Sequence, residues 1–156
     1  MLQEGEKAPA FDLESDGGEK VSLKGLLKAH KYAVVYFYPK DSTPGCTREA
    51  QGFSAAAKEL AKLGAAVVGV SKDSVTSHCN FRDKYELKIP LLSDPDLAVH
   101  KAFGAYGEKV NYGKKTMGTI RSTFLIGAGG KAVRVWGSVK VDGHVEKVIA
   151  AIKELG

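Results

Sequence analysis

The sequence contains few cysteines and no long apolar run. Its 156 residues include two cysteines, too few for the disulfide framework of a small secreted domain. The apolar runs are far too short to span a bilayer, and the N-terminus lacks the basic-then-apolar form of a signal peptide. These absences predict a cytoplasmic protein with no membrane contact. In that compartment a disulfide between the two cysteines would be catalytic rather than structural.

An excess of basic charge is present, but it is small and dispersed. The net charge is +5, and the lysines alternate with acidic residues, with Lys114-Lys115 as the one adjacent basic pair. No repeated aromatic residues accompany that pair for base stacking. A solvated basic surface is therefore expected, and no nucleic-acid partner. A DNA-binding module is the alternative from another functional class, and it would require salt-dependent DNA binding.

A continuous apolar segment leads into a turn and then a helix. Residues Tyr32–Tyr38 are all apolar and mostly β-branched or aromatic, which is typical of a strand buried on both faces. After the turn, apolar residues recur at the three- and four-residue spacing of a helix, at Cys46, Ala50, Phe53, Ala57 and Leu60. Thr43 suits the N-cap and Pro44 the first helical position. The pattern places Cys46 in the first turn of a helix.

Cys46 therefore occupies a position that favours an anionic sulfur. The first N–H groups of a helix lack intrahelical partners, and the helix dipole places partial positive charge there. Ionisation alone speeds a thiol's reaction by at most about thirtyfold at pH 7, so a reactive cysteine also needs a hydroxyl and a fixed cation nearby. Thr43 supplies the hydroxyl. The competing interpretation, a small buried hydrophobic cysteine, does not account for the Thr-Pro-Gly that precedes it.

These residues resemble a known signature. The spacing Pro39-x-x-x-Thr43-x-x-Cys46 resembles the peroxidatic motif of peroxiredoxins, and the longer run YFYPKDSTPGCT resembles the Q-type, or bacterioferritin comigratory protein, branch of that family. The resemblance covers essentially the whole chain. It implies an α/β thioredoxin-like fold, with an N-terminal β-hairpin and a central mixed sheet flanked by helices, in one domain over residues 1–156.

The resemblance also implies an activity. In the family the cysteine thiolate attacks the O–O bond of a hydroperoxide and becomes a sulfenic acid, which makes Cys46 the expected nucleophile of a thiol-dependent peroxidase. Thr43 would bind a peroxide oxygen, while Pro39 and Gly45 would shape the pocket. The implied substrates are hydrogen peroxide and small organic hydroperoxides. A disulfide oxidoreductase of the same fold is the second candidate, but the sequence lacks the Cys-x-x-Cys that such enzymes use.

The expected fixed cation lies far along the chain. Arg121 opens the run RSTFLI, which resembles a late family motif whose arginine completes the peroxide site. A guanidinium stays charged and offers several donors in one plane, which suits an oxyanion and a thiolate together. The alternative is a surface arginine on an edge strand. Glu49, on nearly the same helical face as Cys46, would orient Arg121 as the matching acid does in relatives, or would simply face solvent in the first turns.

Cys79 is the candidate resolving cysteine, although it does not fit the family pattern fully. Many Q-type relatives carry that cysteine five residues after the peroxidatic one, where this chain has Gln51, and others carry it about one turn beyond Cys79, where Arg82 stands. Two hypotheses remain open: Cys79 resolves Cys46 through an intramolecular disulfide, or it is a spectator in a one-cysteine enzyme. A disulfide needs Cα atoms within about 7 Å, so the first hypothesis predicts local unwinding at Cys46.

The remaining segments alternate between strand and helix patterns. The expected strands are Pro9–Leu13, Glu19–Leu23, Ala65–Ser71, Pro90–Ser93, Thr119–Ile126 and Lys131–Trp136. The expected helices cover 24–28, 94–102, a segment from Asp73 or Ser74 to Glu86, and a last segment from Gly143. Residues 105–118 have three glycines and no sustained period, so a loop is expected there.

No metal or bound organic cofactor is implied. The four histidines form no ligand pattern with the cysteines, so surface or cap roles are expected for His30, His78, His100 and His144. By resemblance to the family, the electrons would come from an external dithiol protein, most simply thioredoxin, and the enzyme would act as a monomer.

Overall fold

The computed structural model describes residues 1–111 and 113–156. Its centre is a mixed sheet of five strands, which confirms the expected architecture. In spatial order these are β5 (Leu91–Ser93), β4 (Ala65–Ser71), β3 (Tyr32–Phe37), β8 (Ser122–Ile126) and β9 (Ala132–Trp136). The first three are parallel, and β8 and β9 are antiparallel to their neighbours. Every residue of β3 is buried, as its uninterrupted apolar sequence predicts for a central strand.

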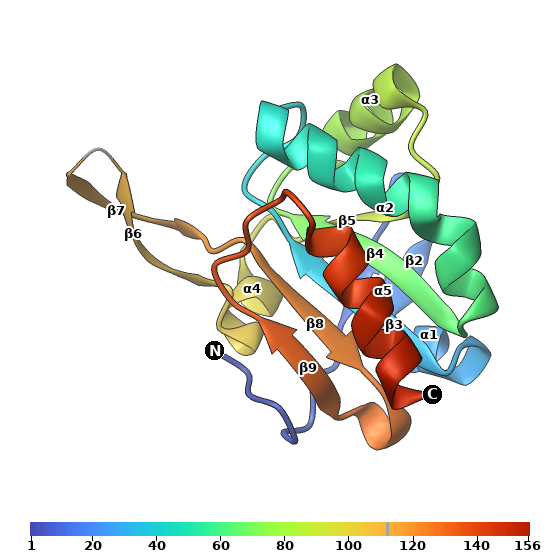
Figure 1. Cartoon of the computed structure of the whole chain (residues 1–156). Coiled ribbons are helices and arrows are strands. Elements are labelled where there is room, and N and C mark those ends of the chain that lie inside the picture. The colour runs from blue at the N-terminus through green and yellow to red at the C-terminus, as the bar shows by residue number, and fades with distance from the viewer. Residues whose placement is uncertain (112) are drawn as a thin grey trace.

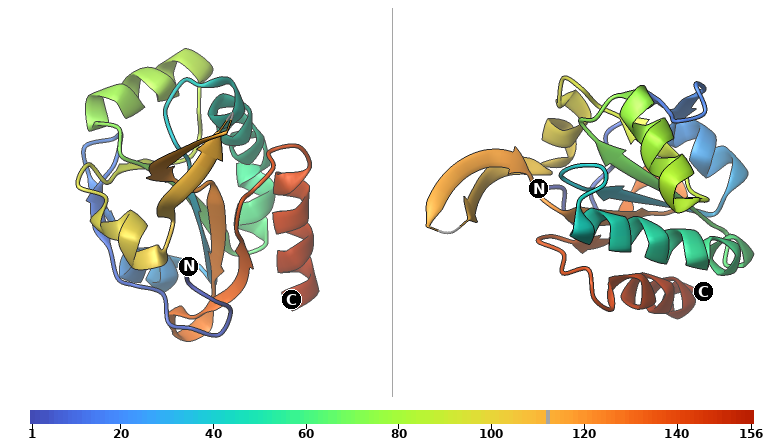
Figure 2. Two further views of the ribbon diagram at one scale, coloured as in Figure 1. Left: turned by 90° about the vertical axis from the view of Figure 1, so that its left-hand side faces the viewer. Right: turned by 90° about the horizontal axis from the view of Figure 1, so that it is seen from above.

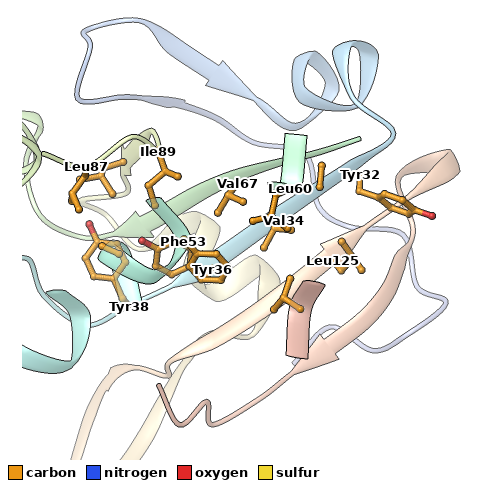
Figure 3. Packing of buried hydrophobic residues seen from close by; sticks show 14 of the residues in the cluster. Tyr32, Val34, Tyr36, Tyr38, Phe53, Leu60, Val67, Leu87, Ile89 and Leu125 are labelled. Atoms are coloured by element: carbon orange, nitrogen blue, oxygen red, sulfur yellow. The ribbon is translucent and has the colours of Figure 1, made fainter. Parts of the chain in front are cut away.

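Helices cover both faces of this sheet (Figure 1 and Figure 2). On one face lie α2 (Pro44–Lys62) and α5 (His144–Leu155), and on the other α1 (Leu23–Ala29) and α4 (Ala98–Phe103), while α3 (Val75–Tyr85) packs beside β5. Side chains of β3 alternate between the two cores, because successive residues of a strand point to opposite faces. Figure 3 shows the core beneath α2, where Tyr36 stacks on Phe53 with ring centroids 4.7 Å apart.

The N-terminal hairpin is present as predicted. It consists of β1 (Asp12–Glu14) and β2 (Lys20–Ser22), which pair in antiparallel fashion. Ser22 then caps α1, since its hydroxyl oxygen accepts the backbone N–H of Gly25 at 3.0 Å. Across the described part of the chain, residues 1–111 and 113–156, no helix has the length and apolarity needed to cross a bilayer.

The expected loop at 105–118 is wrong. The segment forms a second hairpin of β6 (Tyr106–Asn111) and β7 (Lys114–Thr119), which projects from the body of the protein (Figure 1). Residues 114–117 are exposed on both faces of this hairpin, so no alternation of apolar and polar residues marks its strands. The expected strand at 119–126 is accordingly two strands, since β7 ends at Thr119 and β8 begins at Ser122.

The surface or cap role expected for the histidines is also wrong for three of them. His78, His100 and His144 are buried. One ring nitrogen of each forms a hydrogen bond with a side chain, that of Asp41, Asp94 and Thr123 respectively. The partners lie up to 37 residues away in sequence, so no local sequence pattern predicts these hydrogen bonds. Asp94 also accepts the N–H groups of Val99 and His100, which delays the start of α4 to Ala98.

Gly69 on β4 provides a test of the packing beneath α2. A Cβ at this position would lie 2.8 Å from the hydroxyl oxygen of buried Tyr36. We predict that Gly69→Ala lowers the free energy of unfolding by about 1–3 kcal/mol, because overpacking a filled core forces its neighbours to move. Gly17→Ala is the control, since the nearest atom there is 3.8 Å away. Urea denaturation that gives the same stability for both variants would contradict this packing.

Candidate active site

Cys46 lies in the first turn of α2, which begins at Pro44 as predicted. Its side chain is buried, with 1% exposure, among the residues of the core beneath α2. Thr43 is the N-cap residue, but its side chain makes no capping bond. Its hydroxyl instead donates to the carbonyl oxygen of Lys40 at 2.8 Å. With that proton engaged, the Thr43 oxygen can serve a substrate only as a hydrogen-bond acceptor.

Arg121, which directly precedes β8, reaches Cys46 across the sheet. Its Nη2 donates to the sulfur at 3.2 Å, and its Nη1 donates to Oε1 of Glu49 at 2.6 Å. The side chain is 18% exposed, so the alternative of a surface arginine on an edge strand is wrong. The tertiary structure thus brings together three residues that the sequence singled out separately. The result is a fixed cation in contact with the helix-terminal thiol.

Glu49 is fully buried beside Arg121, so the alternative of a solvent-facing acid is wrong. Its side chain has 0% exposure, and within the described residues its second oxygen, Oε2, has no hydrogen-bond partner. Burial raises the pKa of Glu49 to about 7, although the charge and hydrogen bond of Arg121 act in the opposite direction. Burial alone lowers the pKa of Arg121, but the negative charges of Glu49 and Cys46 outweigh it and raise that pKa. The guanidinium therefore stays charged.

Gly45 allows the guanidinium to approach the start of α2. A Cβ at this position would lie 3.3 Å from Nη2 of Arg121, a spacing tighter than ordinary van der Waals contact. A larger residue would push the guanidinium away from the sulfur of Cys46. The glycine of the Thr-Pro-Gly-Cys run is therefore required by close packing at the site.

Pro39 lies at the end of β3, where it lines a hollow of about 220 Å³ that it shares with the projecting hairpin. Lys109, on β6, lines the same hollow. Burial lowers the pKa of Lys109, and so does the charge of Arg121, while Cys46 opposes them. The hairpin therefore brings a second cation near the thiol. No pattern of residues points to Lys109 beforehand, because it belongs to a segment without hydrophobic periodicity.

Cys79 is half-buried on α3, and both cysteines are free thiols. Its sulfur donates to the carbonyl oxygen of Asp16 at 2.9 Å, beside Arg82, which binds the same residue. Phe81, on another face of α3, belongs to the core that contains Cys46. Among the described residues no three His, Cys, Asp or Glu side chains lie close enough to hold a metal ion.

Comparison with known proteins places these features in a family context. Residues 5–135 match the AhpC/TSA family. Peroxiredoxin Bcp of Xanthomonas campestris pv. campestris is 47% identical over 148 residues, which cover 94% of this chain and 91% of that protein. Peroxiredoxin Bcp of Bacillus subtilis is 42% identical over 154 residues, covering 99% and 97%.

Solved structures agree with these relatives. A mutant of PrxQ from Xylella fastidiosa superposes with a TM-score of 0.92 at 36% identity, covering 99% of this chain and 98% of that one. The bacterioferritin comigratory protein of Xanthomonas campestris, studied as a trapped intermediate/ligand complex for its alkyl peroxide reduction activity, gives a TM-score of 0.86 at 46% identity, covering 93% and 91%.

The elevated pKa of Glu49 leads to a prediction about stability and pH. The folded-state pKa, about 7, exceeds the ordinary value of 4.5, so the folded protein binds this proton more tightly than the unfolded chain does. The contribution of protonated Glu49 to the free energy of unfolding is therefore complete below pH 4.5, and it is lost as the pH rises through 7. Glu49→Gln keeps an acceptor for Arg121 but cannot titrate. Between pH 5 and pH 8, the unfolding free energy of wild type relative to this variant should fall, by up to about 3 kcal/mol.

Urea denaturation at several pH values, under reducing conditions, measures this difference. Parallel pH profiles for the two proteins would contradict the assignment of a titrating, buried Glu49.

Proposed function

Because this chain belongs to the AhpC/TSA family and is a peroxiredoxin of the Q or Bcp branch, we propose that Cys46 is its peroxidatic cysteine, with Arg121 and Thr43 binding the peroxide. As a peroxiredoxin, it is a thiol-dependent peroxidase that reduces hydroperoxides. The observation that carries the residue assignment is the 3.2 Å contact between Arg121 Nη2 and the sulfur of Cys46. It places a permanent cation against a thiol that already sits at a helix N-terminus, where a thiolate is stabilised.

The proposed reaction begins with attack by the Cys46 thiolate on one oxygen of the hydroperoxide. The S–O bond forms as the O–O bond breaks, and the leaving oxygen takes up a proton to depart as water or an alcohol. Cys46 is left as a sulfenic acid. Arg121 stabilises the charge that moves from sulfur to the leaving oxygen, and it needs no reorganisation because Glu49 already holds its other nitrogen.

The residues around the thiol serve this step in different ways. The Thr43 oxygen accepts a hydrogen bond from the hydroperoxide O–H, since its own proton is engaged with Lys40. Gly45 shapes the pocket by admitting the guanidinium. Pro39 would limit water beside the loop that leads to Cys46, although the described residues that line its hollow do not include Cys46, Thr43 or Arg121. Thiol chemistry alone balances the reaction, so no metal or organic cofactor takes part in the proposal.

For the second step we propose that Cys79 resolves the sulfenic acid. The Cys79 sulfur attacks the sulfur of Cys46, the S–O bond breaks, and the hydroxyl leaves as water with the thiol proton. For this the first turn of α2 must unwind to expose the buried Cys46, and Cys79 must leave its hydrogen bond to Asp16. That same hydrogen bond favours the alternative, a one-cysteine enzyme in which an external thiol makes the attack.

We further propose the setting in which the enzyme works. An external dithiol protein such as thioredoxin would restore the reduced state, and hydrogen peroxide and small organic hydroperoxides would be the substrates. Residues 1–156 would act as one domain and as a monomer in the cytoplasm, without a nucleic-acid or membrane partner.

Replacement of Arg121 tests the assignment of the cation. Arg121→Lys keeps the charge but loses the planar pair of donors that contacts both Cys46 and Glu49. We predict that the second-order rate constant for reaction with hydrogen peroxide, measured by stopped flow, falls about a hundredfold. Arg48→Lys, on the exposed side of α2 and paired with Asp142, is the matched control and should react within about twofold of wild type. Equal rates for the two variants would contradict the assignment of Arg121 as the cation that binds the peroxide.

Intact-mass and free-thiol analysis after one equivalent of hydrogen peroxide tests the second step. Wild type should lose two hydrogens and both thiols, and Cys46→Ser and Cys79→Ser should not. Addition of one oxygen at Cys46 with Cys79 still free would establish the one-cysteine alternative. Absence of any reaction at Cys46 would overturn its role as the peroxidatic cysteine.

A further inference from the structure

The loop between β3 and Cys46 is held to the rest of the protein by one residue. Over the described parts of the chain, Asp41 makes every hydrogen bond that joins residues 39–43 to a distant segment. Its carboxylate accepts from the Ser77 hydroxyl and from Nδ1 of His78, each at 2.7 Å. Its backbone N–H donates to the Asp73 carboxylate at 2.8 Å. The position of this loop relative to α3 therefore depends on Asp41.

The His78 ring is held at both nitrogens inside the protein. Its side chain is fully buried, with Nδ1 2.7 Å from the Asp41 carboxylate and Nε2 2.9 Å from the carbonyl oxygen of Leu92. The same carboxylate accepts hydrogen bonds from the hydroxyl groups of Tyr38 and Ser77. Asp41 and His78 thus form a buried hydrogen-bonded pair, and loss of either partner would leave buried polar atoms without a partner.

We propose that the hydrogen-bonded pair of Asp41 and His78 is a latch that holds Cys46 in its peroxide-reactive position and must open before the sulfenic acid can be resolved. While it is closed, Cys46 is buried against Arg121, where a small peroxide can react but a second thiol has no access. The latch lies on the same turn of α3 as Cys79. Asp41 and His78 are positioning residues, since neither touches the reacting sulfur.

The latch sets the fate of the sulfenic acid. Once it opens, a thiol attacks the Cys46 sulfur, a disulfide forms and water leaves. If it stays closed, a second hydroperoxide adds an oxygen, which yields the sulfinic acid and water or an alcohol. The inference rests on the proposed function for the peroxidatic role of Cys46. It does not depend on whether the resolving thiol is Cys79 or an external one.

The chain offers a matched control for this pair. Asp94 and His100 form a second buried pair, with Nδ1 of the ring 2.6 Å from Oδ2 and side-chain exposures of 0% and 1%. That pair joins the end of β5 to α4 and makes no hydrogen bond with the loop before Cys46 among the described residues. A substitution there perturbs a similar buried pair without touching the latch.

The test compares Asp41→Asn with Asp94→Asn, both on a Cys79→Ser background. Each amide keeps the shape of the acid but lacks the negative charge, so its hydrogen bond to the histidine is weaker. Hydrogen exchange over residues 40–47 reports on loop release. The rate at which a small added monothiol, 2-mercaptoethanol, captures the Cys46 sulfenic acid reports on access, and the fraction of sulfinic acid in excess hydrogen peroxide reports on its fate.

For Asp41→Asn we expect exchange and capture to be about tenfold faster than in the parent, with less sulfinic acid. The peroxide reaction itself should change less than about threefold, because the closed state remains the main one. Asp94→Asn should leave the exchange rate, the capture rate and the fraction of sulfinic acid near the parent values, even where it lowers the melting temperature as much as Asp41→Asn does.

If 2-mercaptoethanol captures the sulfenic acid no faster in Asp41→Asn than in the parent, the latch proposal is overturned. If capture is accelerated equally in Asp94→Asn, the effect is a general loss of stability and the latch proposal is also overturned. Failure of the proposed function would look different, because no sulfenic acid would form at Cys46 in the parent. In that case the exchange comparison would still decide whether the Asp41–His78 pair holds the loop.

Discussion

The guanidinium of Arg121 is shared between a sulfur and a carboxylate that lie one turn apart on α2. Each partner depends on the others. Glu49 is buried without any other hydrogen-bond donor in the described structure, so it would be costly as an anion without the arginine. Gly45, which has no side chain, leaves room for Arg121 to reach both groups, since a Cβ there would lie 3.3 Å from its Nη2. The reactive arrangement therefore exists only while the first two turns of α2 are formed.

A second group of polar residues lies where the parallel strands end. Asp41, Asp73 and Asp94 follow β3, β4 and β5, and the buried histidines of α3 and α4 pair with the first and the last of them. The carboxyl ends of parallel strands are where open α/β sheets build their sites. Here Asp41 binds the loop before Cys46 to α3, and Asp94 accepts backbone N–H groups in the first turn of α4. Two buried Asp–His pairs thus hold different segments.

These two groups impose opposite requirements on the loop before Cys46. Reaction with a peroxide requires a buried thiol held against a fixed cation, which a rigid loop provides. Resolution by a second thiol requires the same sulfur to become accessible, and Cys79 faces Asp16 rather than the core that contains Cys46. A loop whose hydrogen bonds to distant segments all come from one residue can satisfy both requirements in turn, because few interactions must break to release it.

What the sequence determined by itself is local. The buried strand at 32–37, the start of α2 at Pro44 and the stop at Gly64, whose φ is +82°, follow from residue types and spacing within a few positions. The motifs around Cys46 and Arg121 identified the family on the same basis. The exposed hairpin of β6 and β7 escaped prediction, because strands solvated on both faces show no periodic pattern. Only the tertiary structure decided that Arg121 bridges Cys46 and Glu49, that Cys79 faces Asp16, and that buried His78 pairs with Asp41, since each depends on contacts between residues that are distant in the chain.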